Sequence, residues 1–130
     1  IMKTIAGFAN GDGGTLLMGV TDEGKAIGLD KDYASLSGDK DEFELHLGNL
    51  IDKEFGKIFR VNNISISFPS VDDIQICQVE VKPVNKPIVL ISINKQGQKQ
   101  EKFYLRTGNS TQELTISEAS EFIKSRFQNT

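Results

Sequence analysis

The chain has 130 residues, of which 38% are apolar and 25% charged, and its formal net charge is −3. These proportions exclude an intrinsically disordered chain, and no apolar run is long enough to cross a bilayer. A single cysteine, Cys77, and a single histidine, His46, exclude an internal disulfide and a structural zinc site made from these residue types. We therefore expect one folded cytoplasmic domain over residues 1–130, with no membrane partner.

The small net charge conceals an asymmetry along the chain. Residues 1–80 contain seven basic and 14 acidic side chains, which gives −7, whereas residues 81–130 carry a net charge of +4. An anionic partner is therefore expected to prefer the later part of the chain.

The beginning of the chain predicts a helix followed by two short strands. One helical stripe is formed by Ile1, Ile5, Phe8 and Ala9. We expect this helix to end at Asn10-Gly11, with the glycine in the left-handed conformation. Residues 15–20 and 26–29 predict short strands joined by a turn. Because Ile1 already resembles the middle of an element, we expect the chain to be a fragment.

The remainder predicts two helices and four strands. Apolar residues between Phe43 and Phe59 repeat with the helical period over about five turns. Strands are predicted at residues 64–68, 74–81, 88–93 and 103–106, with 88–93 in a central position and 94–100 forming a hairpin connection. A capping box of Thr115 and Glu118 begins the last helix. Its predicted buried stripe consists of Ile116, Ala119, Phe122, Ile123 and Phe127.

Two features of the first half suggest chemistry but have simpler interpretations. Residues 10–15 are rich in glycine, yet no lysine follows the last glycine, as a Walker loop requires, and Leu16 occupies the third glycine position of a dinucleotide fingerprint. A tight backbone connection is therefore favoured here. Asp22 follows a predicted buried strand, but a magnesium or manganese site needs two or more converging carboxylates, and an Asp-Glu-Gly turn needs no function.

The later half contains a candidate nucleic-acid-binding face. Lys102, Tyr104 and Arg106 alternate with apolar residues, so they share one face of a strand. Lysine and arginine can contact phosphate, and an exposed tyrosine can stack on a base. Lys95 and Lys99 of the adjoining hairpin can extend this patch, and the next loop offers Asn109, Ser110 and Thr111. The alternative is that these residues form the solvated face of an edge hairpin that is protected by lysines.

Two segments of the sequence resemble the Schlafen AlbA-type domain family. Residues 5–24 are similar to the family signature AFAN-x-x-GG-x-x-x-x-GV-x-D-x-G, departing at Gly7, where alanine is usual. Residues 103–111 are similar to its Y-x-R-x-G-x-S/T block, and the order of the elements between the two segments agrees. The resemblance covers essentially the whole chain. It implies an α+β fold, with a mixed β-sheet of about six strands packed with three helices.

The family resemblance also carries expectations about function. Family members occur in bacteria in front of transcriptional regulators and in animals as lobes of Schlafen proteins, and nucleic-acid binding is their shared theme. The nuclease members hold a metal with an aspartate after the Gly-Val strand end and two glutamates from a helix written E-x-x-x-x-E-F-K. Asp22 matches that aspartate, whereas the two glutamates would lie before Ile1. The resemblance therefore implies that residues 1–130 are a fragment that lacks its N-terminal helix.

Three functions follow as hypotheses. The first is DNA or RNA binding through the residues of the later half named above. The second is a metal-dependent endoribonuclease of the transfer-RNA or ribosomal-RNA type, with magnesium or manganese as cofactor and Asp22 as one catalytic metal ligand. The third is an interaction module, in which the domain pairs with itself or with a downstream regulatory domain. A homodimer is expected because family members with two lobes enclose a groove between them.

Overall fold

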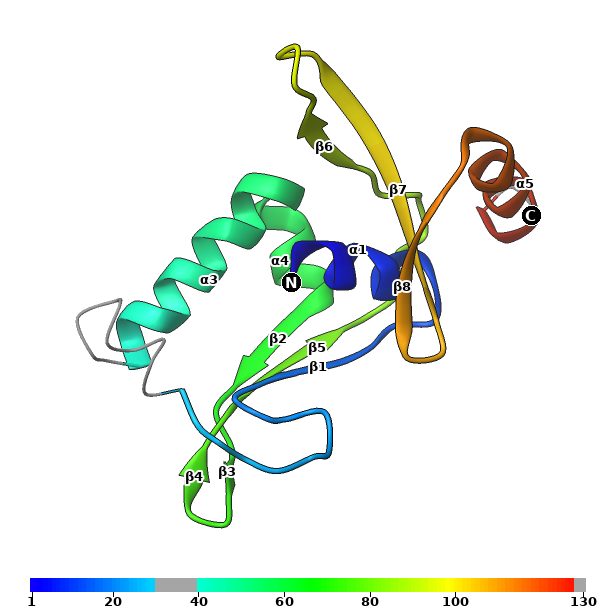
Figure 1. The fold of residues 1–130 in the computed structure, drawn as a ribbon. Helices are drawn as coiled ribbons and strands as arrows, with labels where there is room; N and C mark the ends of the chain where they lie inside the picture. The colour runs from blue at the N-terminus through cyan, green and yellow to red at the C-terminus, as the bar shows by residue number, and fades with distance from the viewer. Residues whose placement is uncertain (30–39, 128–130) are drawn as a thin grey trace. The chain divides into compact units, whose positions relative to one another are not determined.

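A computed structural model of the chain describes residues 1–29 and 40–127, and in these ranges it contains four helices and eight strands in three small sheets. Figure 1 shows this arrangement, which confirms the predicted α+β class. The chain divides into two compact units: unit 1 consists of Ile1–Gly14 and Val81–Thr130, and unit 2 of Thr15–Glu80. None of the described helices has the length and the apolar character that a membrane span requires.

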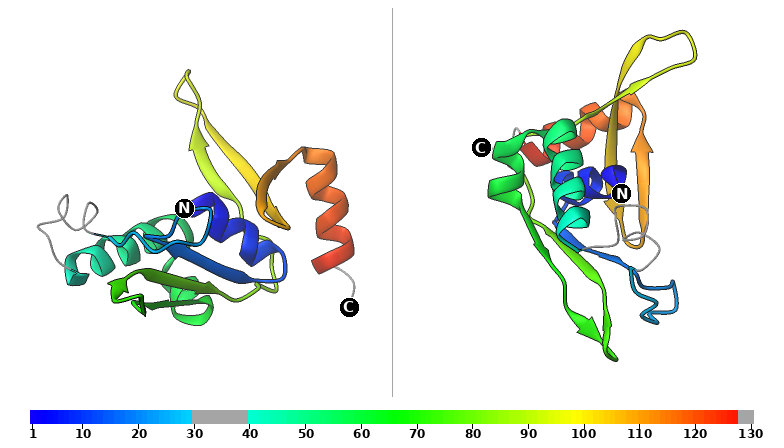
Figure 2. Two further views of the ribbon diagram at one scale, coloured as in Figure 1. Left: turned by 60° about the horizontal axis from the view of Figure 1, so that its bottom comes forward. Right: turned by 90° about the vertical axis from the view of Figure 1, so that its left-hand side faces the viewer.

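Unit 1 is built on an antiparallel sheet with the strand order β6-β7-β8. Its elements are α1 (Met2–Asn10), β6 (Leu90–Ile93), β7 (Lys99–Thr107), β8 (Ser110–Leu114) and α5 (Ile116–Phe127). The prediction that residues 88–93 form a central strand is wrong, because β6 pairs only with β7 and lies at the edge of this sheet. The predicted hairpin is confirmed, and it projects away from α1 in each view (Figure 2).

The helix α1 packs closely on β7, where a Cβ atom at Gly7 would lie only 3.0 Å from the backbone nitrogen of Arg106, and it ends where it was predicted to end. The expectation of a left-handed glycine at Gly11 is wrong, since its φ is −100°. The left-handed residue is Gly13, with φ at +79°, and its N–H donates to the carbonyl oxygen of Phe8 at 2.8 Å. A Cβ atom at Gly13 would lie only 2.6 Å from the carbonyl oxygen of Val81, so this turn requires glycine.

The last helix, α5, begins with the predicted capping box. Thr115 N–H donates to Glu118 Oε1 at 2.9 Å, and Glu118 N–H donates to Thr115 Oγ1 at 3.1 Å. The prediction of a fully buried stripe is wrong, because Ile116 is 90% exposed and the other four residues of the stripe are half-buried. This helix covers only part of the sheet, through contacts such as that of Phe122 with Phe103, whose ring centroids lie 6.1 Å apart.

Within residues 15–29 and 40–80, unit 2 contains a three-stranded sheet in the order β1-β5-β2, a small hairpin and two helices. The strands of the sheet are β1 (Gly14–Met18), β5 (Cys77–Val81) and β2 (Ile64–Ser67); the hairpin is β3 (Ser70–Val71) with β4 (Ile74–Gln75); the helices are α3 (Lys40–Phe55) and α4 (Lys57–Asn63). The strand predicted at residues 26–29 is reduced to a single bridge between Val20 and Ala26.

The long helix predicted between Phe43 and Phe59 is two helices. Gly56 separates them with φ at +91° and ψ at 157°, a conformation that only glycine adopts readily. The apolar period continues across the break, and the rings of Phe55 and Phe59 lie 4.9 Å apart, which is why periodicity alone predicts one helix. Arg60 of α4 donates back to Asp52 of α3, with 2.6 Å between Nε and Oδ1.

The strand predicted at residues 74–81 is interrupted at Ile76, so it forms β4 and β5 instead of one continuous strand. Asp72 and Asp73 make the turn between β3 and β4 with φ of 52° and 64°. Two successive residues in this conformation are typical of the tightest hairpin turns, and aspartate tolerates it better than most side chains.

Candidate nucleic-acid interface

Lys102, Tyr104 and Arg106 share one face of β7, but α1 packs on that face. Lys3 of α1 places its ammonium group 5.6 Å from the ring centroid of Tyr104, and the guanidinium carbon of Arg106 lies 5.2 Å from the ring centroid of Phe8. Tyr104 is therefore only 7% exposed. The expectation of an exposed tyrosine that stacks on a base is wrong, because alternation along a strand shows which residues share a face but not whether another element covers it.

Arg106 takes part in the packing between α1, β7 and β8. Its NH1 group donates to Thr111 Oγ1 at 2.8 Å, and that hydroxyl lies 3.4 Å from Thr4 Oγ1 of α1. The Nε atom of Arg106 is buried and has no hydrogen-bond partner among the described residues. Arg106 and Thr111 are thus held inside unit 1, where they link its elements.

Lys102 is half-buried and already has a partner. Its Nζ lies 3.2 Å from Glu113 Oε2 on β8, and 30% of the lysine side chain is exposed. This carboxylate offsets the charge that a phosphate would otherwise meet, so Lys102 is a weaker candidate contact than a lysine at the hairpin tip.

The exposed members of the predicted set lie at opposite ends of β7. Lys95 and Lys99 belong to the β6–β7 hairpin, whereas Asn109 lies in the turn between β7 and β8 and Ser110 is the first residue of β8 (Figure 1). At the usual rise of a strand, the two ends of β7 are about 27 Å apart. One small ligand cannot touch both groups, whereas an extended polymer can.

The two structural units differ in charge. Unit 1 contains nine basic and five acidic side chains, a net charge of +4, and unit 2 contains six basic and 13 acidic ones, a net charge of −7. The asymmetry that the sequence shows therefore coincides with the division of the fold. Within unit 1, residues 82–100 include four lysines and no acidic residue.

Asn10 is a structural residue of the interface region that the sequence analysis did not single out. It is fully buried, and its side-chain amide donates to the carbonyl oxygens of Ile88 and Tyr104, both at 2.9 Å. Its Oδ1 accepts from Ile88 N–H at 2.9 Å. A signal was available, because Asn10 is part of the first segment that resembles the family.

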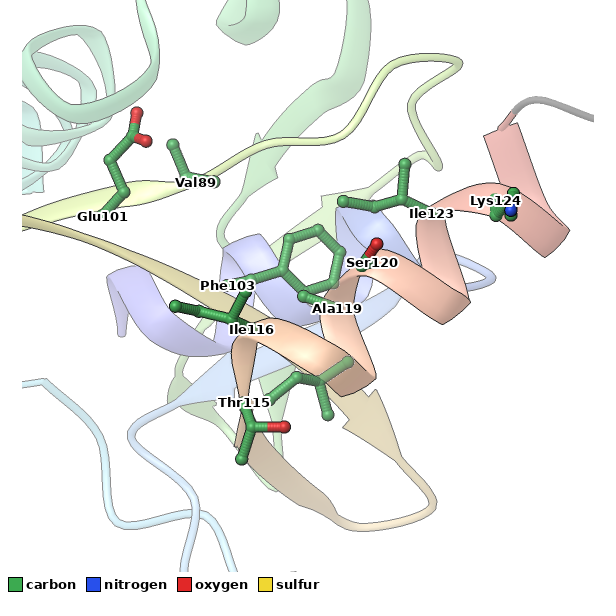
Figure 3. A pocket seen from close by; sticks show the side chains of 10 residues that line it. Val89, Glu101, Phe103, Thr115, Ile116, Ala119, Ser120, Ile123 and Lys124 are labelled. Carbon is green, nitrogen blue, oxygen red and sulfur yellow. The ribbon is translucent and has the colours of Figure 1, made fainter.

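A cavity of about 390 Å³ lies between the sheet of unit 1 and α5 (Figure 3). Its lining includes Phe103, Leu114, Ile116 and Ile123, with Glu101 and Lys124 also present. Phe103 points to the side of β7 opposite to Tyr104, so this cavity is distinct from the predicted basic face. Its apolar lining does not suit phosphate, and it contains none of the predicted binding residues.

Asp22 lies in unit 2, where it is exposed on a turn whose own residues are hydrogen-bonded to one another. Gly24 N–H donates to the carbonyl oxygen of Thr21 at 2.9 Å, and Lys25 N–H donates to Thr21 Oγ1 at 3.1 Å. Among residues 1–29 and 40–127, no three histidine, cysteine, aspartate or glutamate side chains gather closely enough to hold a metal ion. The described residues thus do not form a magnesium or manganese site around Asp22.

Comparison with known proteins identifies a protein family. The family model described as Schlafen, AlbA_2 matches residues 1–115, which include every described element except α5. No curated protein and no solved structure matches the chain.

Proposed function

The chain belongs to the Schlafen, AlbA_2 family, and from this premise we propose that it binds DNA or RNA through unit 1. Family membership suggests a nucleic-acid-related domain. The proposed contacts are the exposed lysines Lys95 and Lys99, assisted by Lys102 and by the turn at Asn109 and Ser110. Tyr104, Arg106 and Thr111 support this surface from inside.

The observation that carries the proposal is the segregation of charge between the two units. A net charge of +4 on unit 1 attracts a polyanion, and the −7 of unit 2 disfavours binding there. Each lysine that contacts a phosphate releases condensed counterions, so binding of this kind weakens steeply as salt rises.

The test is a salt titration of binding by the whole chain and by a Lys95→Ala/Lys99→Ala double variant. We expect the logarithm of the affinity to fall linearly with the logarithm of salt, and the variant to lower the slope by about 1.8, at about 0.9 per lost phosphate contact. Lys53→Ala/Lys57→Ala is the matched control, because it removes two exposed lysines from unit 2. Salt-independent binding, or no binding to duplex DNA, single-stranded DNA and RNA alike, would reject the proposal.

A second candidate function is a metal-dependent endoribonuclease, which the exposed carboxylate of Asp22 favours. The described residues do not form a group of three metal ligands there, so we derive no catalytic step from them. Incubation with transfer RNA and manganese, beside Asp22→Ala and the neighbouring control Glu23→Ala, tests the role of Asp22. Equal cleavage by all three proteins, or none, removes Asp22 from any mechanism.

A third candidate is a homodimer, which the edge strand β6 favours. It has no charged residue, and its Ile91 and Ile93 are 49% and 68% exposed. Antiparallel pairing of β6 with a second copy would bring Ile91 of one chain opposite Ile93 of the other and cover both. Sedimentation at high concentration should show a dimer that Ile93→Lys disrupts; a strict monomer contradicts the proposal.

A further inference from the structure

The tip of the β6–β7 hairpin is a pre-formed turn. Asn94 N–H donates to the carbonyl oxygen of Gln98 at 3.0 Å, and Gly97 N–H donates to the carbonyl oxygen of Asn94 at 3.0 Å. The side chain of Asn94 adds three bonds, since its Oδ1 accepts from Gln96 N–H at 3.0 Å and from Gln98 N–H at 2.9 Å, and its Nδ2 donates to Gln98 Oε1 at 3.1 Å. The left-handed Gly97, with φ at +78°, completes the turn. A ligand therefore meets a tip whose backbone is already ordered.

The chemistry of this tip suits a polyanion that carries hydrogen-bonding groups. Its exposed side chains are Lys95, Gln96, Gln98, Lys99 and Gln100. Along the sequence the nearest acidic residue is Glu101, and residues 82–100 contain no acidic side chain. Lysines can contact phosphates on both sides of a groove, and glutamine amides can pair with base edges, most specifically with N6 and N7 of adenine.

The hairpin offers no platform on which a single strand can stack. Proteins that bind single-stranded nucleic acid place exposed aromatic rings under successive bases. The aromatic residues of β7, Phe103 and Tyr104, are only 5% and 7% exposed, because α5 and α1 contact them from opposite faces. The hairpin is therefore better suited to a duplex, in which the bases are already stacked on one another.

Groove dimensions distinguish the two kinds of duplex. The major groove of B-form DNA is about 12 Å wide and about 8.5 Å deep and admits a two-stranded β-ribbon. The major groove of A-form RNA is deep and narrow and does not admit side chains to the base edges. From these relations we infer that residues 94–100 insert into the major groove of duplex DNA. This inference rests on the proposed nucleic-acid binding and deepens it.

Within the groove, the tip residues have separate roles. Lys95 and Lys99 contact phosphates and set the affinity, whereas Gln96 and Gln100 contact base edges and set the preference among sequences. Asn94 is a positioning residue, because its side chain is occupied by the turn.

The test compares binding of the whole chain to a DNA duplex of about 20 base pairs, two turns of the helix, with the separate DNA strand and an RNA duplex of the same sequence. We expect the DNA duplex to bind at least about tenfold more tightly than the other two. Replacing its purines with 7-deazapurines removes the N7 acceptor from the major groove and should weaken binding severalfold. Gln96→Ala/Gln100→Ala should abolish this sensitivity and leave the salt slope unchanged, whereas Lys95→Ala/Lys99→Ala should lower the slope.

Each other outcome has a defined meaning. Tighter binding to the RNA duplex or the single strand overturns the groove inference and leaves nucleic-acid binding intact. Equal binding to normal and 7-deazapurine DNA also overturns it. Absence of binding to all three ligands rejects the proposed function and the inference together. Thermal unfolding of both double variants should match that of the parent chain, because the altered side chains are exposed.

Discussion

The side-chain amide of Asn10 donates a hydrogen bond to the carbonyl oxygen of Tyr104, 94 positions later in the chain, at 2.9 Å. The same amide nitrogen donates to the carbonyl oxygen of Ile88, and Asn10 Oδ1 accepts from Ile88 N–H. One buried side chain thus joins the end of α1 to β7 and to the segment that leads into β6. The hairpin that we propose as the DNA contact leaves the body of unit 1 at this junction.

We predict that Asn10→Ala destabilises the chain by about 2–4 kcal/mol, because it leaves three backbone groups of Ile88 and Tyr104 without this partner. Asn10→Asp should be at least as harmful, since an ionised carboxylate cannot donate to the two carbonyl oxygens. Urea unfolding monitored by circular dichroism measures both changes. The control is Asn109→Ala, at an exposed asparagine, which should stay within about 0.5 kcal/mol of the parent. Equal stability of the Asn10→Ala and Asn109→Ala variants contradicts the prediction.

The ion pair between Lys102 and Glu113 predicts an order of effects on nucleic-acid affinity. Lys99→Ala should weaken binding more than Lys102→Ala, because Glu113 already offsets the charge of Lys102 at 3.2 Å. Glu113→Gln should strengthen binding severalfold by releasing Lys102 and removing a repelling carboxylate. Fluorescence anisotropy at low salt measures the three variants. Glu121→Gln on α5 is the control, and an equal gain from it assigns the effect to net charge alone.

The turn after α1 predicts a difference between two glycine substitutions. Gly13→Ala forces alanine into φ near +79° and places Cβ 2.6 Å from the carbonyl oxygen of Val81. Gly24→Ala meets a similar φ of +87°, but nothing lies within 4 Å of its Cβ. We expect about 1–2 kcal/mol of destabilisation at Gly24 from backbone strain, and at least about 1 kcal/mol more at Gly13 from the close contact. Denaturant midpoints check this order, and a smaller loss at Gly13 contradicts it.

The parts of the fold that the sequence predicted correctly depend on neighbouring residues. The capping box of Thr115 and Glu118, the hairpin around residues 94–100 and the alternating strand that begins at Ile64 each need only a few consecutive positions. The break at Gly56 was missed although it is local, because the apolar period continues through it. At Gly56 the chain changes direction, although the hydrophobic pattern continues unchanged.

The candidate site was predicted less well because its geometry depends on distant contacts. Lys102, Tyr104 and Arg106 share a face as expected, but only tertiary packing brings α1 over it. The separation between Lys95 and Asn109 could have been predicted, because β7 lies between them and its length fixes the distance. The burial of Tyr104 could not, because no local pattern shows which element will cover a strand.

The capping box of α5 predicts that the stability of this helix depends on pH in the acidic range. Hydrogen bonds from the backbone N–H and the hydroxyl of Thr115 lower the pKa of the Glu118 carboxyl. Because the folded pKa is depressed, this contribution to helix stability is present above the unfolded pKa and is lost as pH falls through the folded value. The protection of the α5 amides against hydrogen exchange, measured relative to the intrinsic exchange rate at each pH, should therefore fall in acid. Glu118→Gln should flatten the response and Glu121→Gln should retain it; identical profiles for both variants rule out this role for Glu118.

The buried thiol of Cys77 predicts that the free energy of unfolding depends on pH in the alkaline range. The thiol is fully buried in β5, and this burial, with the negative charge of Glu44 as a smaller cause, raises its pKa from 9.0 to about 11. In the unfolded chain the thiol ionises near its ordinary value, so the folded state alone retains the proton between these two values. The neutral thiol makes its full contribution to the free energy of unfolding below pH 9. This contribution declines as pH rises from 9 towards 11, by roughly 3 kcal/mol over the interval.

A comparison with Cys77→Ala isolates this contribution from the lysines and tyrosines that titrate in the same range. The variant should lose some stability at every pH because of the cavity it creates, but its free energy of unfolding should fall less steeply between pH 9 and 11. Urea unfolding at several pH values measures both slopes. Parallel plots of unfolding free energy against pH for the two proteins would show that the fold does not hold the thiol neutral. Rapid alkylation of the folded chain by iodoacetamide at pH 8 would show the same, because the thiolate is the reactive form.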